Sequence, residues 1–299
     1  MLLSHRTVVL PEAGARLATH AVIHEGFRVL AVERLHVISE DELLVRGFAR
    51  RGALGRPIAT VLLEGRGRLR APGEERWIAR GERSIAATKT GLLMRQEAPR
   101  YRSVVCEWEP GRWGERPAPS LDVARVDDAH LARLAAFADA LAAADRDPST
   151  VADELEAAWA ALRELGVPLA PFARTAAFAE AVSESTLRVA EALDELQSNL
   201  KGAPMMVDLE RATGLSARQL QRLVHDFNAR YGFNASTWRD TRNRWRLLAG
   251  ATLMTAPGAT AEAVARAVGF GSVSTFARAL ADVGLPPPTE IADVVRALA

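Results

Sequence analysis

Two stretches near the carboxyl end of the chain share one pattern, and this pattern constrains the fold more than any other feature. They span residues 208–216 and 264–272. Each contains a short helix-forming run, a glycine, an apolar residue and, within two further positions, a serine. Glycine readily adopts the left-handed conformation that ends a helix, and serine is a preferred N-cap for the helix that follows. The pattern therefore predicts two helix-turn-helix units.

The helix that begins at Ser216 is expected to have two different faces. Its apolar stripe, at helical spacing, consists of Leu220, Leu223, Val224 and Phe227. The opposite side carries Arg218, Gln221, Arg222 and His225. Arginine and glutamine are side chains that bond guanine and adenine edges in the major groove. A solvated helix face can have the same composition, but the repeated turn favours a DNA-reading interpretation.

Residues 207–290 resemble the DNA-binding domain of the AraC/XylS family of bacterial transcription regulators. The most specific match is residues 265–272, together with Phe276, Arg278, Gly284 and Pro287. In this family a long helix joins the two units, and residues 234–255 suit that role. The resemblance implies that the two recognition helices enter successive major-groove segments, about 34 Å apart, on one face of the duplex.

The candidate DNA-binding residues come from three places. The first recognition helix supplies Ser216, Ala217, Arg218, Gln221, Arg222 and His225. The second supplies Ser272, Ser274, Thr275 and Arg278. Four arginines of the joining helix are expected to contact phosphates: Arg239, Arg242, Arg244 and Arg246. Because the charges around the second helix cancel, we expect the first unit to read bases and the second to contact phosphate and DNA shape.

Several residues depart from the family pattern. Glu210 stands where a small alanine is usual, and we expect it to reach solvent or an arginine, because a buried unpaired carboxylate is costly. Ala235 replaces the usual proline after Gly232, and Ile291 replaces a common arginine. The first unit is also longer between its glycines, which predicts a first recognition helix nearly a turn longer than the second.

Residues 1–118 have the pattern of β structure. Short alternating runs such as 58–63, 65–70 and 76–79 are separated by glycine and proline, with a turn at 71–74. Many short strands with frequent turns predict a sandwich or small barrel. Combined with the resemblance, they predict an α+β chain that begins with a β-sandwich or cupin-like sensor domain.

Residues 119–200 are expected to form a helical coupling and dimerisation segment. Positions 121–200 hold 6 basic and 15 acidic residues, so this layer is a poor surface for DNA. It could cover the β domain, pair with another subunit, or do both. Residues 201–299, after a hinge at 201–204, form the predicted all-α domain with two helix-turn-helix units.

A small-molecule pocket in the β domain is implied by the resemblance. Its candidate lining residues are Trp77, Met94, Val104 and Trp108, although an aromatic and sulfur set like this also suits a plain core. Arg80 and Arg95 could pair with an anionic ligand. Residues 65–70 lack the histidines of metal-dependent cupins, so we expect no metal, no cofactor and no catalytic residue. The single cysteine, Cys106, is expected in the core rather than as a redox sensor.

These patterns together predict a regulator of transcription rather than an enzyme. Its expected partners are double-stranded DNA, a small-molecule effector, a second copy of the chain and RNA polymerase. Two alternatives stay open: a regulator without a small ligand, and a cupin-type enzyme fused to a DNA-binding domain. The sequence shows neither a signal peptide nor an apolar run long enough for a membrane span, which predicts a cytoplasmic protein.

Overall fold

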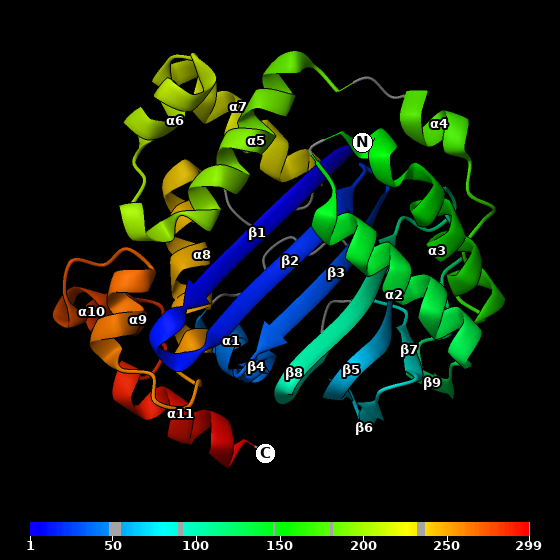
Figure 1. Ribbon diagram of the computed structural model, residues 1–299, viewed down its shortest axis with the longest axis horizontal. Helices are drawn as coiled ribbons and strands as arrows, with labels where there is room; N and C mark the ends of the chain where they lie inside the picture. Colours follow the sequence, from blue (N-terminus) through cyan, green and yellow to red (C-terminus); the bar gives the residue numbers. More distant parts are fainter. Residues whose placement is uncertain (48–54, 89–91, 146, 180–181, 232–236, 299) are drawn as a thin grey trace.

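The computed structural model describes residues 1–47, 55–88, 92–145, 147–179, 182–231 and 237–298. The fold is α+β: an antiparallel sheet formed by the first part of the chain lies between helices formed by the rest (Figure 1). No helix within these residues is both long and apolar enough to cross a lipid bilayer.

All nine strands of the described residues belong to one sheet. They are β1 (Leu2–Leu10), β2 (Ala15–Ile23), β3 (Phe27–Leu35), β4 (Ser39–Glu40), β5 (Ile58–Ala71), β6 (Glu74–Ala79), β7 (Glu82–Ala86), β8 (Leu93–Trp108) and β9 (Asp122–Arg125). The order is β1-β2-β3-β8-β5-β7-β9, with β4 paired to β8 and β6 paired to β5. The predicted β region is therefore present, while its cupin-like character stays a prediction.

Glycine determines where the long strand β5 turns and bends. The predicted turn at 71–74 joins β5 to β6, and Gly73 lies in it at φ 75°. Gly65 has φ 88°, beside register shifts in the pairing of β5 with β8. A Cβ on Gly65 would lie 2.8 Å from the carbonyl oxygen of Arg100, so no larger residue fits without movement. Such bulges bend a strand, and here β5 leaves β7 to pair with β6.

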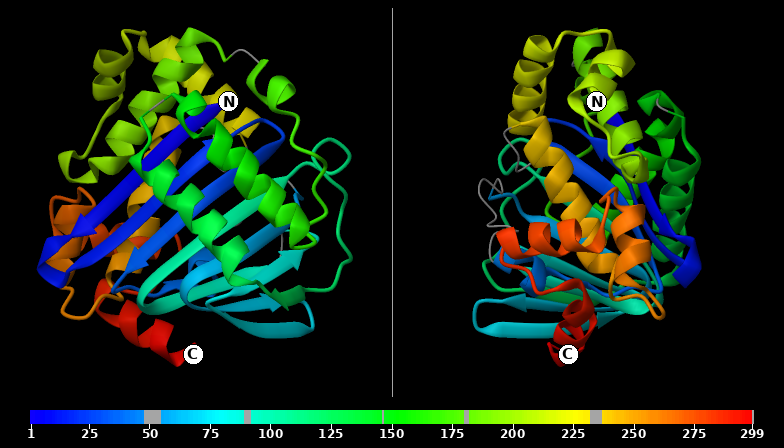
Figure 2. Two further views of the ribbon diagram at one scale, coloured as in Figure 1. Left: turned by 45° about the vertical axis from the view of Figure 1, so that its right-hand side comes forward. Right: turned by 90° about the vertical axis from the view of Figure 1, so that its left-hand side faces the viewer.

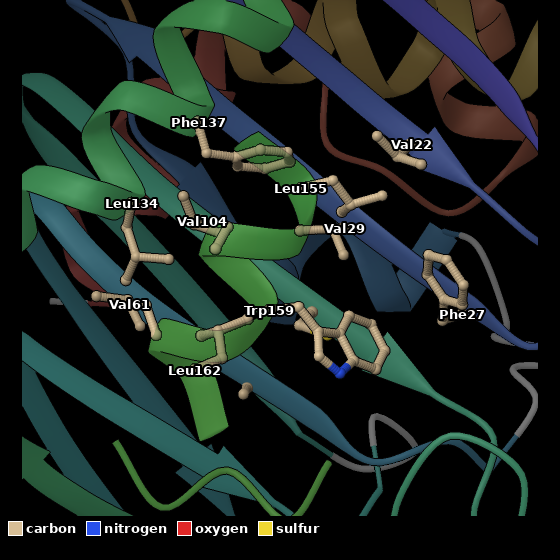
Figure 3. Packing of buried hydrophobic residues seen from close by; sticks show 14 of the residues in the cluster. Val22, Phe27, Val29, Val61, Val104, Leu134, Phe137, Leu155, Trp159 and Leu162 are labelled. Carbon is tan, nitrogen blue, oxygen red and sulfur yellow. The ribbon is translucent and has the colours of Figure 1, made fainter. Parts of the chain in front are cut away.

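Two helices cover the front face of the sheet, the face toward the viewer in Figure 1. They are α2 (Asp128–Ala143) and α3 (Ala152–Glu164). Figure 3 shows how their side chains pack on the strands, and the labelled residues are Leu134, Phe137, Leu155, Trp159 and Leu162 over Val22, Phe27, Val29, Val61 and Val104. The predicted acidic segment thus covers the sheet, and its role in pairing subunits stays a prediction.

Helix α4 (Arg174–Ala179) lies near α3 and packs into the same core through Ala177. The other helices lie along one edge of the sheet and over its back face. They are α1 (Asp41–Gly47), α5 (Glu184–Ser198), α6 (Met206–Thr213), α7 (Ala217–Tyr231), α8 (Trp238–Leu253), α9 (Ala261–Ala267), α10 (Val273–Asp282) and α11 (Pro288–Ala297). Three short 3-10 helices are η1 (Pro11–Ala13), η2 (Pro148–Val151) and η3 (Leu200–Gly202). In the right-hand view of Figure 2, the strands lie between α8 on one side and the pair α2 and α3 on the other.

The carboxyl-terminal helices share their cores with the sheet. One cluster joins Leu2 and Ile23 of the strands to side chains of α5, α6 and α7. Another joins Val8 and Leu10 to α8, α9, α10 and α11. The helical part of the chain is therefore docked on the strands along its whole length. The division into three domains at 118 and 200 stays a prediction.

Helix α5 closes the outer edge of β1. The Asp194 carboxylate accepts hydrogen bonds from the Ser4 hydroxyl (2.8 Å) and the His5 backbone N–H (3.0 Å), and it pairs with Arg6. The Ser198 hydroxyl donates to the His5 carbonyl oxygen at 3.1 Å. These bonds satisfy edge-strand groups that would otherwise need water or another strand.

A buried ionic cluster fastens α11 to the sheet. Arg95 of β8 donates to Glu40 (3.0 Å), to Glu97 (2.6 Å) and to the Val295 carbonyl oxygen at the end of α11 (2.8 Å). Arg68 of β5 donates to the Leu298 carbonyl oxygen. Cations stabilise the C-terminal end of a helix, where carbonyl groups lack intrahelical partners.

Candidate nucleic-acid interface

The first helix-turn-helix unit consists of α6, a short turn and α7. Gly214 ends α6 in the left-handed conformation, with φ 69° and ψ 14°, and its N–H donates to the Glu210 carbonyl oxygen at 2.8 Å. Ser216 pairs with Gln219 at the start of α7, since the Gln219 side-chain oxygen accepts from the Ser216 backbone N–H at 3.0 Å. The Ser216 hydroxyl also donates to Gln219 instead of accepting from the helix.

Glu210 is partly exposed and has a local partner in place of an arginine. Its carboxylate accepts the backbone N–H of Ala217 at 2.8 Å and so lies against the start of α7. The first N–H groups of a helix have no intrahelical partner, and a negative charge there is favourable. The departure from the family pattern is therefore compensated locally.

The two faces predicted for α7 are present. Its buried side chains are Leu220, Val224, Phe227, Asn228 and Tyr231. The exposed ones include Arg218, Gln221, Arg222 and His225. Neither Arg218 nor Arg222 makes a hydrogen bond or ion pair with another described residue. Both guanidinium groups are therefore available to an outside partner.

The second unit repeats the turn with a fully formed cap. Gly269 has φ 78°, and the Ser272 hydroxyl accepts from the Thr275 N–H at 3.2 Å while the Thr275 hydroxyl oxygen accepts from the Ser272 N–H at 3.3 Å. Ser272, Ser274, Thr275 and Arg278 are all exposed. Helix α10 has 10 residues and α7 has 15, so the helix after the first turn is the longer one, as predicted.

The two turn glycines differ in their surroundings. A Cβ added at Gly214 would meet no atom within 4 Å. A Cβ added at Gly269 would lie 2.1 Å from the Leu200 carbonyl oxygen, because η3 packs directly on the second turn. The second unit is therefore held against the segment that precedes the first.

Helix α8 joins the two units (Figure 1). Its arginines do not share one role. Arg239 is exposed. Arg242 is half-buried, and its guanidinium donates to the Pro204 carbonyl oxygen (2.9 Å) and contacts the Met205 sulfur. Burial, with a smaller contribution from Arg239, lowers the pKa of Arg242.

The expected phosphate contact by Arg246 has to be corrected. Its Nε donates to the Val268 carbonyl oxygen at 2.7 Å, a second nitrogen donates to Gly269, and the guanidinium carbon lies 3.9 Å from the ring centre of Phe270. Burial, reinforced by Arg242, lowers the pKa of Arg246 to about 10. Arg246 therefore caps α9 and the second turn from inside the protein.

The large apolar side chains of the joining segment lie in two kinds of place. Trp238 and Met254 are buried, whereas Trp245 and Leu248 line a cavity. Ile291 is fully buried in the cluster around α8 to α11, so its place in the core explains the departure from arginine. Gly232, Asn234 and Ala235 lie outside the described residues.

The four predicted ligand-lining residues do not lie around one cavity. Val104 and Trp108 belong to the core beneath α2 and α3, and Met94 belongs to a cluster on the other face. Trp77 is 45% exposed, beside Arg66 and Arg68. Of the two arginines considered for an anion, Arg95 is held in the ionic cluster under α11, and Arg80 is exposed at the end of β6.

Cys106 lies fully buried in the front core, and burial raises the pKa of its thiol. A buried neutral thiol is a poor nucleophile, which agrees with the expected core role. Within the described ranges, no group of three or more His, Cys, Asp or Glu side chains is arranged to hold a metal ion.

A cavity that sequence reasoning missed lies between the back face of β1–β3 and α8. Its volume is about 270 Å³. Helix α8 contributes Thr241, Arg244, Trp245 and Leu248, which share one helical face. The strands contribute three arginines, Arg6, Arg28 and Arg34. The alternation of Arg28, Leu30 and Arg34 with apolar Phe27, Val29 and Ala31 was visible in the sequence, but the element that would cover it was not.

No protein-family model and no curated protein matches the chain. Solved structures with some likeness include ToxT from Vibrio cholerae O395, which is 10% identical over 90% of this chain and 98% of that chain, with a TM-score of 0.35. Apo ToxT of a variant from Vibrio cholerae strain SCE256 is 11% identical over 89% of this chain and 97% of that one, with a TM-score of 0.34. A putative glyoxylate-induced protein from Pseudomonas aeruginosa is 13% identical over 36% of this chain and 41% of that one, with a TM-score of 0.29. Likenesses this distant assign neither a family nor a function.

Proposed function

We propose that the chain is a sequence-specific DNA-binding transcription regulator in which α7 is the main base-reading helix. The observation that carries this proposal is the exposed row Arg218, Gln221, Arg222 and His225, presented on a helix that follows a glycine-ended turn. The same helix-glycine-helix arrangement recurs at α9 and α10. Exposed guanidinium and amide groups on such a helix have the donor geometry that major-groove base edges accept.

The two units divide the work in this proposal. Helix α7 offers two arginines, a glutamine and a histidine, whereas α10 offers hydroxyls and the single exposed Arg278. The Ser272 and Thr275 hydroxyls already bond to each other's backbone groups. We therefore assign base recognition to α7 and phosphate and shape contacts to α10.

Phosphate contacts from α8 are assigned to Arg239 first. It is exposed, and no described residue bonds to it. Arg242 belongs to the same proposed surface, but its bond to the Pro204 carbonyl oxygen restricts its reach. Each arginine that neutralises a phosphate releases counterions, so Arg239→Ala should reduce the salt dependence of DNA binding by about one unit of log–log slope.

The sheet and its covering helices would supply regulation. A small-molecule effector, pairing of two chains through the acidic helices and contact with RNA polymerase are parts of this proposal. An effector would act by changing how freely the two units align on one duplex, which is a shift between existing conformations. A cytoplasmic location follows from the same role.

Selection from a random-sequence duplex library with the full chain tests DNA recognition directly. A recovered consensus then allows fluorescence anisotropy with single base changes. Arg222→Ala should weaken binding by about 1–3 kcal/mol and relax the preference at one base position. Arg278→Ala should weaken binding to consensus and altered sites by the same factor.

The control is Arg296→Ala, an exposed arginine of α11 that pairs with Asp293 and lies outside the proposed surface. It should bind DNA as the unaltered chain does. Failure to recover any consensus would argue against sequence-specific recognition. Equal, sequence-independent losses for Arg222→Ala and Arg278→Ala would argue against the division between α7 and α10.

A further inference from the structure

The cavity between β1–β3 and α8 has walls of two kinds. Its apolar part includes Ile23, Leu30, Trp245 and Leu248. Its polar part includes Arg6, Arg28, Arg34 and Arg244, and none of the described residues that line it is acidic. Ligand sites commonly combine an apolar wall with a few fixed polar groups. The sign of the charge here selects an anion.

Two of the strand arginines already have carboxylate partners outside the cavity wall. Arg6 pairs with Asp194 at 3.1 Å, and Arg28 pairs with Glu107. These pairs fix the guanidinium groups in place and offset part of their charge. They are therefore suited to shaping the cavity rather than to supplying its main positive charge.

Arg34 differs, because it makes no ion pair with any described residue. One of its terminal nitrogens donates to the carbonyl oxygens of Ala18 and Glu33, both at 2.8 Å, and approaches the Thr19 hydroxyl at 3.4 Å. No hydrogen bond from its other two nitrogens to a described residue exists. Burial lowers the pKa of Arg34 to about 10, so the protein bears a cost to keep this charge at the cavity.

The opposite wall is the helix that joins the two DNA-binding units. Thr241, Arg244, Trp245 and Leu248 face the cavity from α8. Two contacts hold the Trp245 ring in place. Its indole N–H donates to the Gln197 carbonyl oxygen at 3.1 Å, and the guanidinium carbon of Arg6 lies 5.4 Å from the ring centre. A molecule in the cavity would therefore contact the sheet and the joining helix at once.

We propose that this cavity binds a small organic anion with an apolar body, whose carboxylate or phosphate group pairs with Arg34 while its apolar part packs against Trp245, Leu248 and Leu30. Guanidinium groups suit both carboxylate and phosphate oxygens, often through two parallel hydrogen bonds. The bound anion stabilises the docked position of α8. The effect on DNA binding rests on the proposed function, whereas the site itself does not.

Isothermal titration of the full chain with three ligands of one shape tests the site. They are 2-naphthoate, 2-naphthyl phosphate and the neutral 2-naphthalenemethanol. At least one anion should bind with one molecule per chain and at least about tenfold more tightly than the alcohol. The stronger anion identifies the preferred group. Equal binding of all three, or binding of none, would overturn the proposal.

Variants of Arg34 separate recognition from a structural role. Arg34→Gln should lower the preference for the anion over the alcohol by at least about tenfold, and Arg34→Lys should restore part of it. A purely structural role would reduce binding of both ligands equally and leave the preference unchanged, which would contradict the proposal. Arg76→Gln, which removes an exposed arginine of β6, is the matched control and should bind as the unaltered chain does.

A second variant keeps the test decisive if Arg34→Gln fails to fold. Leu248→Trp fills the cavity from α8 and should abolish binding of the anion while circular dichroism shows an intact helical content. Unchanged binding in a folded Leu248→Trp chain would place the ligand elsewhere and overturn the proposal.

Coupling is tested separately, with a labelled duplex long enough for two successive major-groove segments. Saturating anion should change DNA affinity at least threefold in the unaltered chain and not in Leu248→Trp. If the anion binds by titration but the DNA affinity is unchanged, the proposed coupling is wrong and the proposed binding site still stands. DNA affinity absent with and without the anion would instead contradict the proposed function.

Discussion

His5 and His20 form a cross-strand pair on β1 and β2 whose protonation is restricted by geometry. Their Nδ1 atoms lie 2.8 Å apart, so one ring must donate and the other accept. Two protonated rings cannot satisfy this contact. Burial, followed by the charges of His5 and Arg16, lowers the pKa of His20 from 6.5 to about 4.

Because the folded-state pKa of His20 is depressed, the folded chain should lose stability as the solution becomes acidic. The contribution is complete above pH 6.5, falls as pH decreases below this value, and is fully lost near pH 4. Its total size is at most about 3 kcal/mol. Urea denaturation at pH 7.5 and pH 5 should show a smaller loss of unfolding free energy in His20→Gln than in the unaltered chain. Identical losses would show that His20 does not titrate in this way.

At the scale of elements, the two helix-turn-helix units are built from one local pattern but are held differently. Gly214 and Gly269 both lie in the left-handed region. Only Gly269 is pressed against the Leu200 carbonyl oxygen of η3. The pattern of the turn is therefore local, whereas the anchoring of the second unit depends on a segment about seventy residues earlier.

Alanine substitution at the two glycines should separate these contributions. Gly214→Ala should cost about 1 kcal/mol, since the positive φ is the only obstacle. Gly269→Ala should cost roughly 2 kcal/mol more, because its Cβ also requires η3 to move. Gly258, with φ 75° and open space around it, offers a third comparison through Gly258→Ala. Equal unfolding free energies for all three variants, measured in urea, would contradict the contact with η3.

At the scale of the whole molecule, the ionic cluster around Arg95 joins the first part of the chain to its last helix. Arg95→Met would leave Glu40 and Glu97 buried without this partner and would release the Val295 carbonyl oxygen. We expect a loss of about 3–5 kcal/mol in the free energy of unfolding. Arg76→Met, which removes an exposed ion pair, should cost less than about 1 kcal/mol. Comparable losses in the two variants would refute a special role for the buried cluster.

The shared cores make a second prediction at this scale. Val8 and Leu10 of β1 pack among α8 to α11, and Leu2 and Ile23 pack among α5 to α7. A separate chain of residues 201–299 would expose these apolar surfaces, so its helical content and thermal stability should fall well below those of the same segment in the full chain. A fully folded fragment by circular dichroism would show that the predicted domain is independent of the sheet.

Sequence reasoning succeeded where the determining interactions are close along the chain. The left-handed Gly214 and Gly269, the two faces of α7 and the turn at 71–74 all depend on neighbouring residues. It failed where distant elements meet. Arginine is a residue type that often contacts phosphate, and Arg246 lies among other arginines in the sequence. Its actual partners, the carbonyl oxygens of Val268 and Gly269, become known only when α8 and α9 are packed together.

The predicted ligand residues failed for a related reason. Met94 and Val104 lie on one strand but belong to clusters on opposite faces of the sheet. Both are even-numbered positions, which strict alternation along β8 would place on one face. The register shifts in the pairing of β8 with β5 lie between them and break this alternation. The arginines of β3 were equally visible, yet a cavity exists there only because α8 covers them.

The closure of β1 by α5 also has a consequence for how the protein behaves in concentrated solution. Strand β1 is nine residues long and would form a template for another copy of the chain if α5 moved away. By bonding to the backbone of His5, Asp194 and Ser198 hold α5 over this edge and so block edge-to-edge pairing with another copy of the chain. Since α5 leads through η3 into α6, a displacement of the first helix-turn-helix unit that pulls α5 away would also expose the edge of β1.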